Sequence, residues 1–473
     1  MSRLSVVRHP SSVVRRRHAV RAIAFLVFLP LPLMLGLDLF TGSEYTAAGG
    51  SLKAEDFMIF YTGGKLANEG RALDAYNYGV MLTTIRAQVG EPPPDLSITP
   101  TFSTTWPIYL YSPPATLLFT LLARLPYFGG LAVWLLTGLA AMLLALYLLR
   151  RALPYLQRQP YWVLAFFALG FWPLNIVFTN GQNSAFTFLA YVAVFYLTRP
   201  DDGRRTTDGR QELYVTGRPS SVVRRPSSLF KNTAIGEWLA GLAAAALALQ
   251  KPQLLIGLLL VWLLVWKWRV LAGLVVGVTT ACALTLLVLP PATFGAWVGN
   301  LLSFSTAALD APIPDTDVTV RTLLRQSLPF AKGMANTLYY VYFIVALCLL
   351  VLALRRLYYA PLDAARKHMW LYVLAVIFSV DTPNYLLIYD LTLLLLPILL
   401  LFALYDRPED LAGNRPRLKV MTAFLYIGII ACHFLGIATG VQLGGVVSLV
   451  YLGYALFLFY QDTRASSVIV RQA

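Results

Sequence analysis

The stretch GLAVWLLTGLAAMLLALYLL, residues 130–149, contains no charged residue. A helix needs about 20 consecutive apolar residues to cross the hydrocarbon core of a bilayer. Two arginines, Arg150 and Arg151, follow it immediately, as is typical of a helix that ends at the cytoplasmic membrane surface. The stretch therefore predicts a transmembrane helix.

Runs of the same kind recur along the chain and predict about 12 transmembrane helices in one all-α, polytopic integral membrane protein. The composition agrees, because only 13% of the residues are charged, whereas soluble domains have about 25%. We therefore expect a single membrane domain over residues 1–473, multi-pass in the plasma membrane. The predicted spans are residues 22–37, 130–149, 161–178, 184–197, 236–249, 254–266, 271–289, 338–354, 369–380, 385–404, 420–435 and 441–459.

The net charge of +15 is typical either of nucleic acid binding or of basic loops at a membrane. Here the arginines flank apolar runs, so we expect membrane lipid and no nucleic acid as a partner. The three cysteines, Cys282, Cys348 and Cys432, lie inside apolar runs without the spacing of a metal site. We expect neither a metal nor a cofactor.

The basic clusters predict the topology, because cytoplasmic loops collect Lys and Arg. All clusters face the cytoplasm if residues 112–126 form an interfacial helix that does not cross the membrane, which their shortness and leading prolines permit. Both termini and an Arg-rich insert at about residues 199–232 are then cytoplasmic. The first extracytoplasmic loop covers about residues 41–111 and a later outer loop about residues 290–337.

Two adjacent carboxylates, Glu55 and Asp56, begin a half-aromatic stretch that runs to Lys65. The aromatic residues recur at helical spacing and predict the membrane-facing side of a helix. A carboxylate at a helix start can simply be a cap that the helix dipole favours. Beside a lipid phosphate, in a partly dry site, the same carboxylate could deprotonate an acceptor hydroxyl. The residues alone leave both interpretations open.

Two tight turns on the expected outer side carry polar residues. Gln182 and Asn183 follow an Asn-Gly turn, so they either complete a hairpin or direct amides into a sugar pocket. Lys251 stands ahead of Pro252 and Gln253 between two apolar runs. This lysine either extends to the membrane interface or binds an anionic phosphate.

Further polar residues lie in the outer segments of the second half. Arg321 and Arg325 are four residues apart, so on a helix they share a face suited to a lipid phosphate, although a solvated loop is the alternative. Asn384 and Tyr385 open another outer turn. Asp390 lies in an apolar run, where a carboxylate either marks a functional site or pairs with a buried Lys or Arg.

These motifs together resemble glycosyltransferase family 87, multispanning enzymes of the GT-C type that use polyprenyl-phosphate-mannose-type donors. The resemblance implies a GT-C-type bundle with juxtamembrane helices in the first outer loop. It also implies an inverting transfer at the outer face, with Asp56 as the base and Glu55 as the alternative. Members of the family carry a histidine in the late outer turn, whereas this chain has Asn384, so no proton-handling role is expected there. The resemblance rests on Asp56-Phe57 through Tyr61-x-x-Gly64, Gly70 to Tyr76, Tyr111-Ser112-Pro113-Pro114, Gly181-Gln182-Asn183, Lys251-Pro252-Gln253 and Tyr389-Asp390.

The expected function is metal-independent transfer of a hexose, with mannose as the first candidate, from a polyprenyl-phosphate sugar to a glycolipid or glycan acceptor. Lys251, Arg321 and Arg325 would hold the donor phosphate. The alternative is a transporter or flippase of lipid-linked sugars, although the internal repeats typical of transporters are not apparent. The expected substrate contacts are Glu55, Tyr61, Lys65, Tyr111, Gln182, Asn183, Lys251, Gln253, Arg321, Arg325, Asn384, Tyr385 and Asp390.

Overall fold

A computed structural model describes residues 41, 43, 45, 53–89, 109–200, 234–310, 317–406 and 414–472, apart from the side chains of 304–310 and 465–472. This part of the chain is all-helical, as predicted, with one isolated antiparallel bridge between Asp317 and Leu387. The elements are α3 (Glu55–Asn68), η1 (Ala72–Tyr76, a 3-10 helix), α4 (Tyr78–Val89), α5 (Pro113–Leu122), α6 (Tyr127–Ala152), α7 (Pro154–Gln157), α8 (Tyr161–Leu169), α9 (Trp172–Asn180), α10 (Ser184–Leu197), α11 (Ala234–Gln250), α12 (Pro252–Leu264), α13 (Trp268–Leu286), α14 (Ala292–Asp310), α15 (Val320–Ser327), α16 (Lys332–Tyr359), α17 (Ala364–Asp381), η3 (Ile388–Leu394, 3-10), α18 (Leu395–Leu404), α19 (Asn414–Thr439) and α20 (Gly444–Gln472).

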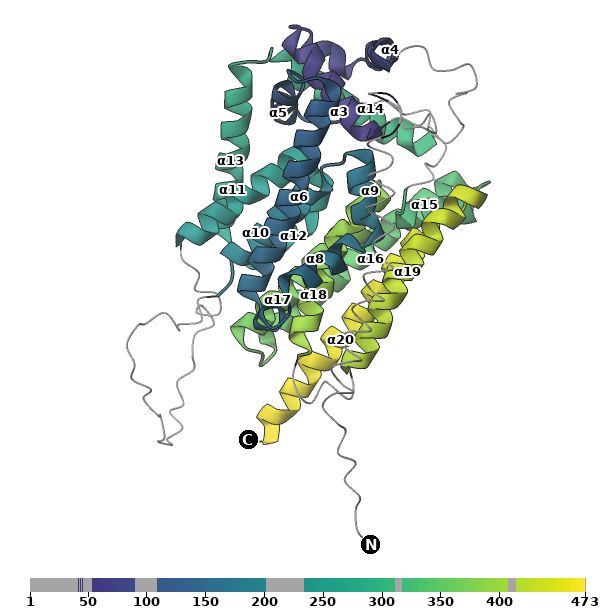
Figure 1. Cartoon of the computed structure of the whole chain (residues 1–473). Helices are drawn as coiled ribbons and strands as arrows, with labels where there is room; N and C mark the ends of the chain where they lie inside the picture. The colour runs from purple at the N-terminus through teal and green to yellow at the C-terminus, as the bar shows by residue number, and fades with distance from the viewer. Residues whose placement is uncertain are drawn as a thin grey trace.

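The helices α3, α4, α5 and α14 gather with η1 at one end of the molecule, and we call this group the cap (Figure 1). The Trp297 indole N–H of α14 donates to the Leu110 carbonyl over 3.0 Å and so ties α14 to the segment before α5. A second apolar core, around Phe57 and Phe60 of α3 and Trp134 of α6, joins the cap to the bundle. Phe57 and Phe60 are both 0% exposed, so the prediction that the aromatic side of this helix faces the membrane is wrong.

Five described helices are long and apolar enough to cross a membrane: α6, α13, α16, α19 and the first part of α20. The pair α8–α9 adds a sixth if it is one span with a 73° bend. The chain is therefore a multi-pass membrane protein. The prediction of about 12 spans, however, is not confirmed.

The difference between prediction and structure lies in helix length. Five further apolar helical segments, α5, α10, α11, α12 and η3–α18, have only 10–17 residues. At 1.5 Å per residue, even the longest extends about 26 Å, which is less than the hydrocarbon thickness of about 30 Å. The predicted span at residues 22–37 lies outside the described residues, as does most of the insert predicted at residues 199–232.

The segment predicted to be interfacial forms the short helix α5, which packs on α3. Gly64 of α3 meets the backbone of Phe119 so closely that a side chain there would overlap it. The Asn68 amide donates to the Thr120 carbonyl over 2.9 Å at the other end of the contact. The location of α5 at a membrane interface stays a prediction. The predicted outer loop at residues 290–337 contains α14 and α15.

Helices α10, α12 and α17 are joined in the core by one hydroxyl. Ser379 Oγ of α17 accepts from the Gly257 backbone N–H of α12 and from the Tyr191 hydroxyl of α10, both over 2.9 Å. A side chain at Gly257 would overlap the Ala375 backbone, so this glycine permits the close approach of α12 and α17. The N-terminal ends of α10 and α12, which carry the predicted polar turns, are thereby fixed relative to each other.

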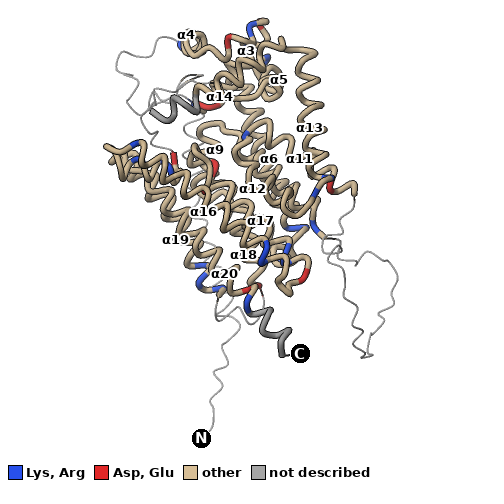
Figure 2. Tube along the Cα trace, turned by 180° about the vertical axis from the view of Figure 1, so that it is seen from behind, with Lys and Arg blue, Asp and Glu red and all other residues tan. Residues whose placement is uncertain are grey.

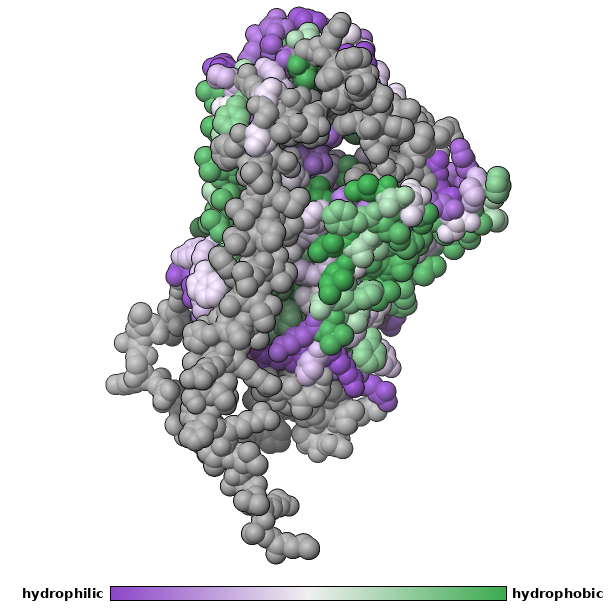
Figure 3. Space-filling view, turned by 45° about the vertical axis from the view of Figure 1, so that its right-hand side comes forward, coloured by the Kyte–Doolittle hydropathy of each residue, from purple (hydrophilic) through white to green (hydrophobic). Residues whose placement is uncertain are grey.

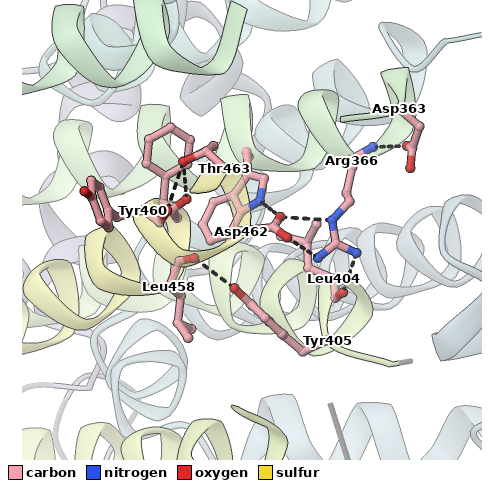
Figure 4. A network of polar contacts seen from close by, with 10 residues as sticks. Asp363, Arg366, Leu404, Tyr405, Leu458, Tyr460, Asp462 and Thr463 are labelled. Carbon is pink, nitrogen blue, oxygen red and sulfur yellow. Dashed lines mark hydrogen bonds and ion pairs between the residues drawn. The ribbon is translucent and has the colours of Figure 1, made fainter. Parts of the chain in front are cut away.

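The end of the bundle away from the cap is rich in charged residues (Figure 2). Asp462 of α20 accepts from the Arg366 guanidinium over 2.6 Å and from the Trp370 indole over 2.7 Å (Figure 4). Arg366 also donates to the Leu404 carbonyl over 3.1 Å and so satisfies the end of α18. This network docks α20 on α17 and α18. Other ion pairs are Arg158–Asp406, Arg415–Asp406 and Lys267–Glu237.

The flank between the two ends of the molecule carries many hydrophobic side chains (Figure 3). On α16, for example, Tyr340, Ile344 and Leu352 are exposed large hydrophobic residues. An apolar flank between polar ends is the surface expected of helices that contact lipid.

Candidate functional site

The first turn of α3 presents Asp56 to the rest of the bundle. The helix begins at Glu55, and its N-cap is Ala54, which has a left-handed φ of 51° and no side-chain capping bond. The Asp56 carboxylate instead lies close to the side chains of Gln182 and Asn180, whose N–H groups favour its ionised form. Asp56 is therefore not the N-terminal capping residue of α3 but part of a contact with a distant turn.

That turn lies between α9 and α10 and is shaped by Gly181, which has a φ of 66°. A Cβ at Gly181 would lie 2.6 Å from the Phe57 Cβ, so only glycine allows α3 to come this close. The Trp134 indole N–H donates to the Gly181 carbonyl over 2.7 Å. The Gln182 amide donates to the Tyr389 hydroxyl over 2.8 Å and lies close to Asp56.

A buried ion pair lies beside this contact. Lys251, the N-cap of α12, pairs with Asp390 of η3 and donates to the Ser184 hydroxyl over 2.8 Å. The Ser184 hydroxyl donates to the same Asp390 oxygen over 2.9 Å. The ammonium also lies 4.7 Å from the centroid of the Tyr389 ring, within the range of a cation–π contact. The Asp390 charge is therefore balanced within the protein.

Burial and charge separate the acidities of the two adjacent carboxyls. Burial raises the pKa of Asp56 to about 6, even though Gln182, Lys251 and Asn180 all act to lower it. Burial and the charge of Asp56 raise the pKa of Glu55 to about 8. At neutral pH Asp56 is mainly ionised and Glu55 mainly protonated, so Asp56 is the better proton acceptor.

Asn183 is buried in the same turn, and its side chain has no hydrogen-bond partner among the described residues. It is 1% exposed, and neither its amide nitrogen nor its amide oxygen has a partner. Asn183 is the N-cap of α10, but its side chain makes no capping bond. Buried amides almost always find partners, so this one has an unused donor and acceptor beside Gln182 and Ser184.

Helix α15 holds the two predicted arginines. Arg321 is 4% exposed and Arg325 is 7% exposed, and their like charges lie close enough to interact. Arg321 donates to the Asn384 carbonyl and to the Asn336 side chain, both over 3.3 Å. Its second terminal nitrogen has no hydrogen-bond partner in the part of the chain that the structure describes. Burial lowers the pKa of Arg321.

Tyr385 connects the arginine helix to the carboxylates. The Val318 N–H donates to the Leu386 carbonyl over 2.9 Å, which holds the start of α15 against the segment after α17. After burial itself, the charges of Asp317 and Asp56 are the next causes that raise the pKa of Tyr385. The phenol therefore lies near both carboxylates, and α15 belongs to the same region of the molecule as Asp56.

Tyr111, also predicted as a contact, faces the site. Burial and the Asp56 charge raise its pKa, whereas the nearby Gln182 side chain acts to lower it. Its ring packs against Phe60 of α3 with centroids 4.4 Å apart. Tyr111 thus forms an aromatic wall next to the carboxylate.

Four other predicted contacts lie elsewhere or serve the fold. The Tyr61 hydroxyl donates to the Leu125 carbonyl over 2.8 Å inside the cap. Lys65 is nine residues beyond Asp56 on the same helix, about 13 Å along its axis. The Gln253 and Asn384 side chains are exposed, and Asn384 joins the arginine helix only through its carbonyl. A substrate contact is not supported for Tyr61, Lys65 or Gln253.

Sequence reasoning omitted three residues from the site: Asn180, Ser184 and Tyr389. Asn180 and Ser184 bound the turn that holds Gln182 and Asn183, and Tyr389 immediately precedes Asp390. Their adjacency to predicted site residues is the sequence signal for them. Their partners, however, lie 124 to 207 positions away: Asp56 for Asn180, Asp390 for Ser184 and Gln182 for Tyr389.

Comparison with known proteins identifies one family. A model of glycosyltransferase family 87 matches residues 109–382, which is 274 of the 473 residues. The match includes Gln182, Asn183 and Lys251, begins after Asp56 and ends before Asp390. No curated protein and no solved structure matches the chain.

Proposed function

The chain belongs to glycosyltransferase family 87 and is a membrane glycosyltransferase, and from this premise we propose the reaction that its site carries out. The enzyme transfers a hexose, with mannose as the first candidate, from a polyprenyl-phosphate sugar to a hydroxyl of a glycolipid or glycan acceptor. The transfer inverts the anomeric centre and requires no metal.

One observation carries this proposal: a mainly ionised, partly buried carboxylate is held by side chains from distant segments. Asp56 on α3 meets Gln182 from the α9–α10 turn, Lys251 from α12 and Asp390 from η3. Strongly shifted acidities that combine burial with specific partners are typical of functional sites. The pKa of Asp56, about 6, suits a base that works near neutral pH.

In the proposed reaction Asp56 accepts the proton of the acceptor hydroxyl. The hydroxyl oxygen then forms a bond to the anomeric carbon while the bond from that carbon to the phosphate oxygen breaks. The polyprenyl phosphate leaves with the electron pair, and attack on the opposite face inverts the anomeric centre. Glu55, whose pKa is about 8, is protonated at neutral pH and is the weaker candidate for the base.

Arg321 and Arg325 are the proposed ligands of the departing phosphate. Both are buried, their charges interact, and Arg321 donates to the Asn384 carbonyl. Within the described part of the chain, one terminal nitrogen of Arg321 has no hydrogen-bond partner. Two guanidiniums kept together in a partly dry place are stabilised by an anion between them. Positive charge aimed at a leaving phosphate would also stabilise the transition state.

The proposed orientation places the cap and the site outside the cytoplasm. Lys and Arg positions gather at the end of the bundle away from the cap (Figure 2). Among the basic residues, Arg158 follows α7, Lys267 precedes α13 and Arg366 lies in the first turn of α17. Loops rich in Lys and Arg stay on the cytoplasmic side. The cap then lies on the extracytoplasmic side, where α5 would rest at the membrane interface.

The experiment that tests this function is a transfer assay on the purified chain in lipid nanodiscs. Labelled polyprenyl-phosphate mannose is supplied with a panel of glycolipid and glycan acceptors, for wild type and Asp56→Asn. Loss of the base should lower kcat at least about 100-fold while the protein stays folded. Equal transfer by wild type and Asp56→Asn would overturn the assignment of the base.

The matched control is Asp74→Asn, which removes a carboxylate from the same outer segment. Asp74 is an exposed partner of Arg71 at 2.8 Å and lies in η1. Exposed ion pairs contribute little to stability, so this variant should transfer like wild type. Other polyprenyl-linked hexoses in the same assay identify the sugar.

A further inference from the structure

The Lys251 ammonium is fully engaged inside the protein. It pairs with Asp390, donates to the Ser184 hydroxyl over 2.8 Å and lies over the Tyr389 ring at 4.7 Å. An ammonium has three N–H donors, and these three partners account for them. A donor phosphate could reach Lys251 only by displacing one of them. The prediction that Lys251 holds the phosphate is therefore not supported.

The partners of Lys251 lead toward Asp56 instead. The Tyr389 hydroxyl, beside the ammonium, accepts from the Gln182 amide over 2.8 Å. The second hydrogen of that amide is available for Asp56, which lies close enough for Gln182 to favour its ionised form. The side chains of Lys251, Tyr389, Gln182 and Asp56 thus form a continuous chain of contacts.

The ion pair is difficult to explain as a device for stability. Lys251 is 5% exposed and Asp390 is 3% exposed. Removing two charges from water offsets most of the attraction between them, so a buried pair adds little net stability. Its place beside the proposed base suggests that it acts on the chemistry.

We propose that Lys251 and Asp390 form a positioning pair that aligns the Asp56 carboxylate through Tyr389 and Gln182 and balances its charge. This inference rests on the proposed function, because it concerns the base of that reaction. Neither residue touches the substrate, and the donor phosphate is held by other groups.

The charges around Asp56 determine whether each substitution should raise or lower the pKa of this carboxyl. Lys251 favours the ionised form of Asp56, whereas Asp390 disfavours it. Removal of Lys251 alone therefore raises the pKa of Asp56, and removal of Asp390 alone lowers it. Removal of both restores the balance. The titratable groups that face Asp56 are Glu55 on α3, Tyr111 before α5, Lys251 at α12, and Tyr385, Tyr389 and Asp390 around η3.

The test measures kcat/KM against pH for Lys251→Met, Asp390→Asn and the double variant. Wild type should lose activity as the pH falls through about 6, because the base becomes protonated. This acid limb should move up by about one pH unit in Lys251→Met and down in Asp390→Asn. Below the limb, one unit corresponds to an about tenfold change in rate. The double variant should return close to the wild-type profile.

A phosphate ligand predicts a different result. Lys251→Met would then raise the KM for the donor at least about tenfold with an unchanged acid limb. Asp390→Asn would leave the limb in place, and the double variant would be as impaired as Lys251→Met. Either finding would overturn the inference. If Lys251→Met does not fold, two measurements still test the positioning pair. They are the downward shift of the acid limb in Asp390→Asn and the pH profile of the double variant.

Two controls complete the design. Lys267→Met removes a comparable lysine that pairs with Glu237 over 2.7 Å, between α11 and α13. It should leave the acid limb unchanged, which separates a local effect from the general loss of an ion-paired, partly buried lysine. Asp56→Asn is assayed in parallel: if that variant transfers normally, the proposed function fails. If Asp56→Asn is inactive but the acid limb stays in place in the Lys251 and Asp390 variants, the proposed function stands and only the positioning pair is contradicted.

Discussion

Three consecutive residues, Gln182, Asn183 and Ser184, have different partners although they share one turn. The Gln182 side chain donates to the Tyr389 hydroxyl and lies close to Asp56. The Ser184 hydroxyl accepts from Lys251 and donates to Asp390. Asn183 alone among the three has a side chain without a hydrogen-bond partner, and it is 1% exposed. An unused buried amide offers one acceptor and two donors, which suits a sugar hydroxyl. We therefore assign sugar recognition to Asn183 as part of the proposed function.

Asn183→Leu is expected to abolish discrimination between sugar hydroxyl patterns. A protein site that hydrogen bonds a sugar hydroxyl disfavours the sugar analogue without that hydroxyl, because the polar groups of the site then stay unpaired. Wild type should use one monodeoxy donor about 10- to 100-fold less efficiently than the parent sugar, and Asn183→Leu should use both alike. The measurement is kcat/KM for a panel of monodeoxy polyprenyl-phosphate sugars.

The control for this prediction is Asn175→Ala on α9. The Asn175 amide already donates to the Leu169 carbonyl over 2.7 Å, so its loss should affect stability and not sugar choice. If Asn183→Leu still discriminates between the parent and monodeoxy sugars as wild type does, another residue recognises the sugar hydroxyl.

At the level of elements, the approach of α3 to the α9–α10 turn decides whether the site forms. Gly181 permits this approach by two means: its left-handed φ of 66° and its lack of a Cβ. Both features follow from glycine alone. The base and the Gln182 amide belong to these two elements, so their geometry depends on one contact.

Gly181→Ala is expected to separate α3 from the turn and to lower transfer strongly. The left-handed backbone costs about 1–2 kcal/mol for alanine, and overlap with Phe57 adds about 1–3 kcal/mol. Gly70→Ala is the matched control, because Gly70 has a similar φ of 73° with nothing within 4 Å of an added Cβ. Thermal unfolding of both variants in detergent should show the larger loss for Gly181→Ala.

The comparison isolates the contact from the backbone strain. Transfer should survive in Gly70→Ala and fall at least about tenfold in Gly181→Ala, because only the latter displaces Asp56 from Gln182. Equal losses of stability and activity in the two variants would mean that the close approach is unimportant.

For the whole molecule, the distribution of charge predicts which end faces the cytoplasm. The cap carries the proposed base, and the other end carries the ion pairs of Arg158, Lys267 and Arg366. In a membrane the basic end stays cytoplasmic. The active site of the intact enzyme would then be reached from the outside.

Cysteine labelling of intact cells tests this orientation. The three native cysteines are first replaced by alanine, and Leu73→Cys in the cap or Arg158→Cys at the other end is then introduced. Both positions are exposed. A maleimide that cannot cross the membrane should label only Leu73→Cys until the cells are permeabilised. Labelling of Arg158→Cys in intact cells would reverse the orientation.

The sequence already contained much of the element pattern, because the length of an apolar run reflects the local transfer of side chains from water to lipid. The runs at residues 130–149 and 338–354 became the spans α6 and α16. Run length was less reliable where helices are short. The runs at residues 184–197 and 254–266 form α10 and α12, which fall below the length of a full span.

By itself, the sequence determined that the protein is an α-helical, multi-pass membrane glycosyltransferase and where its polar turns lie along the chain. Only the tertiary structure decided that Lys251 pairs with Asp390, 139 residues away, and that Asp56 meets Gln182 and not its own helix end. Hydropathy and spacing act locally, whereas these pairings depend on which helix ends come together. That arrangement follows from close contacts such as those at Gly181 and Gly257, where the absence of a side chain lets two elements meet.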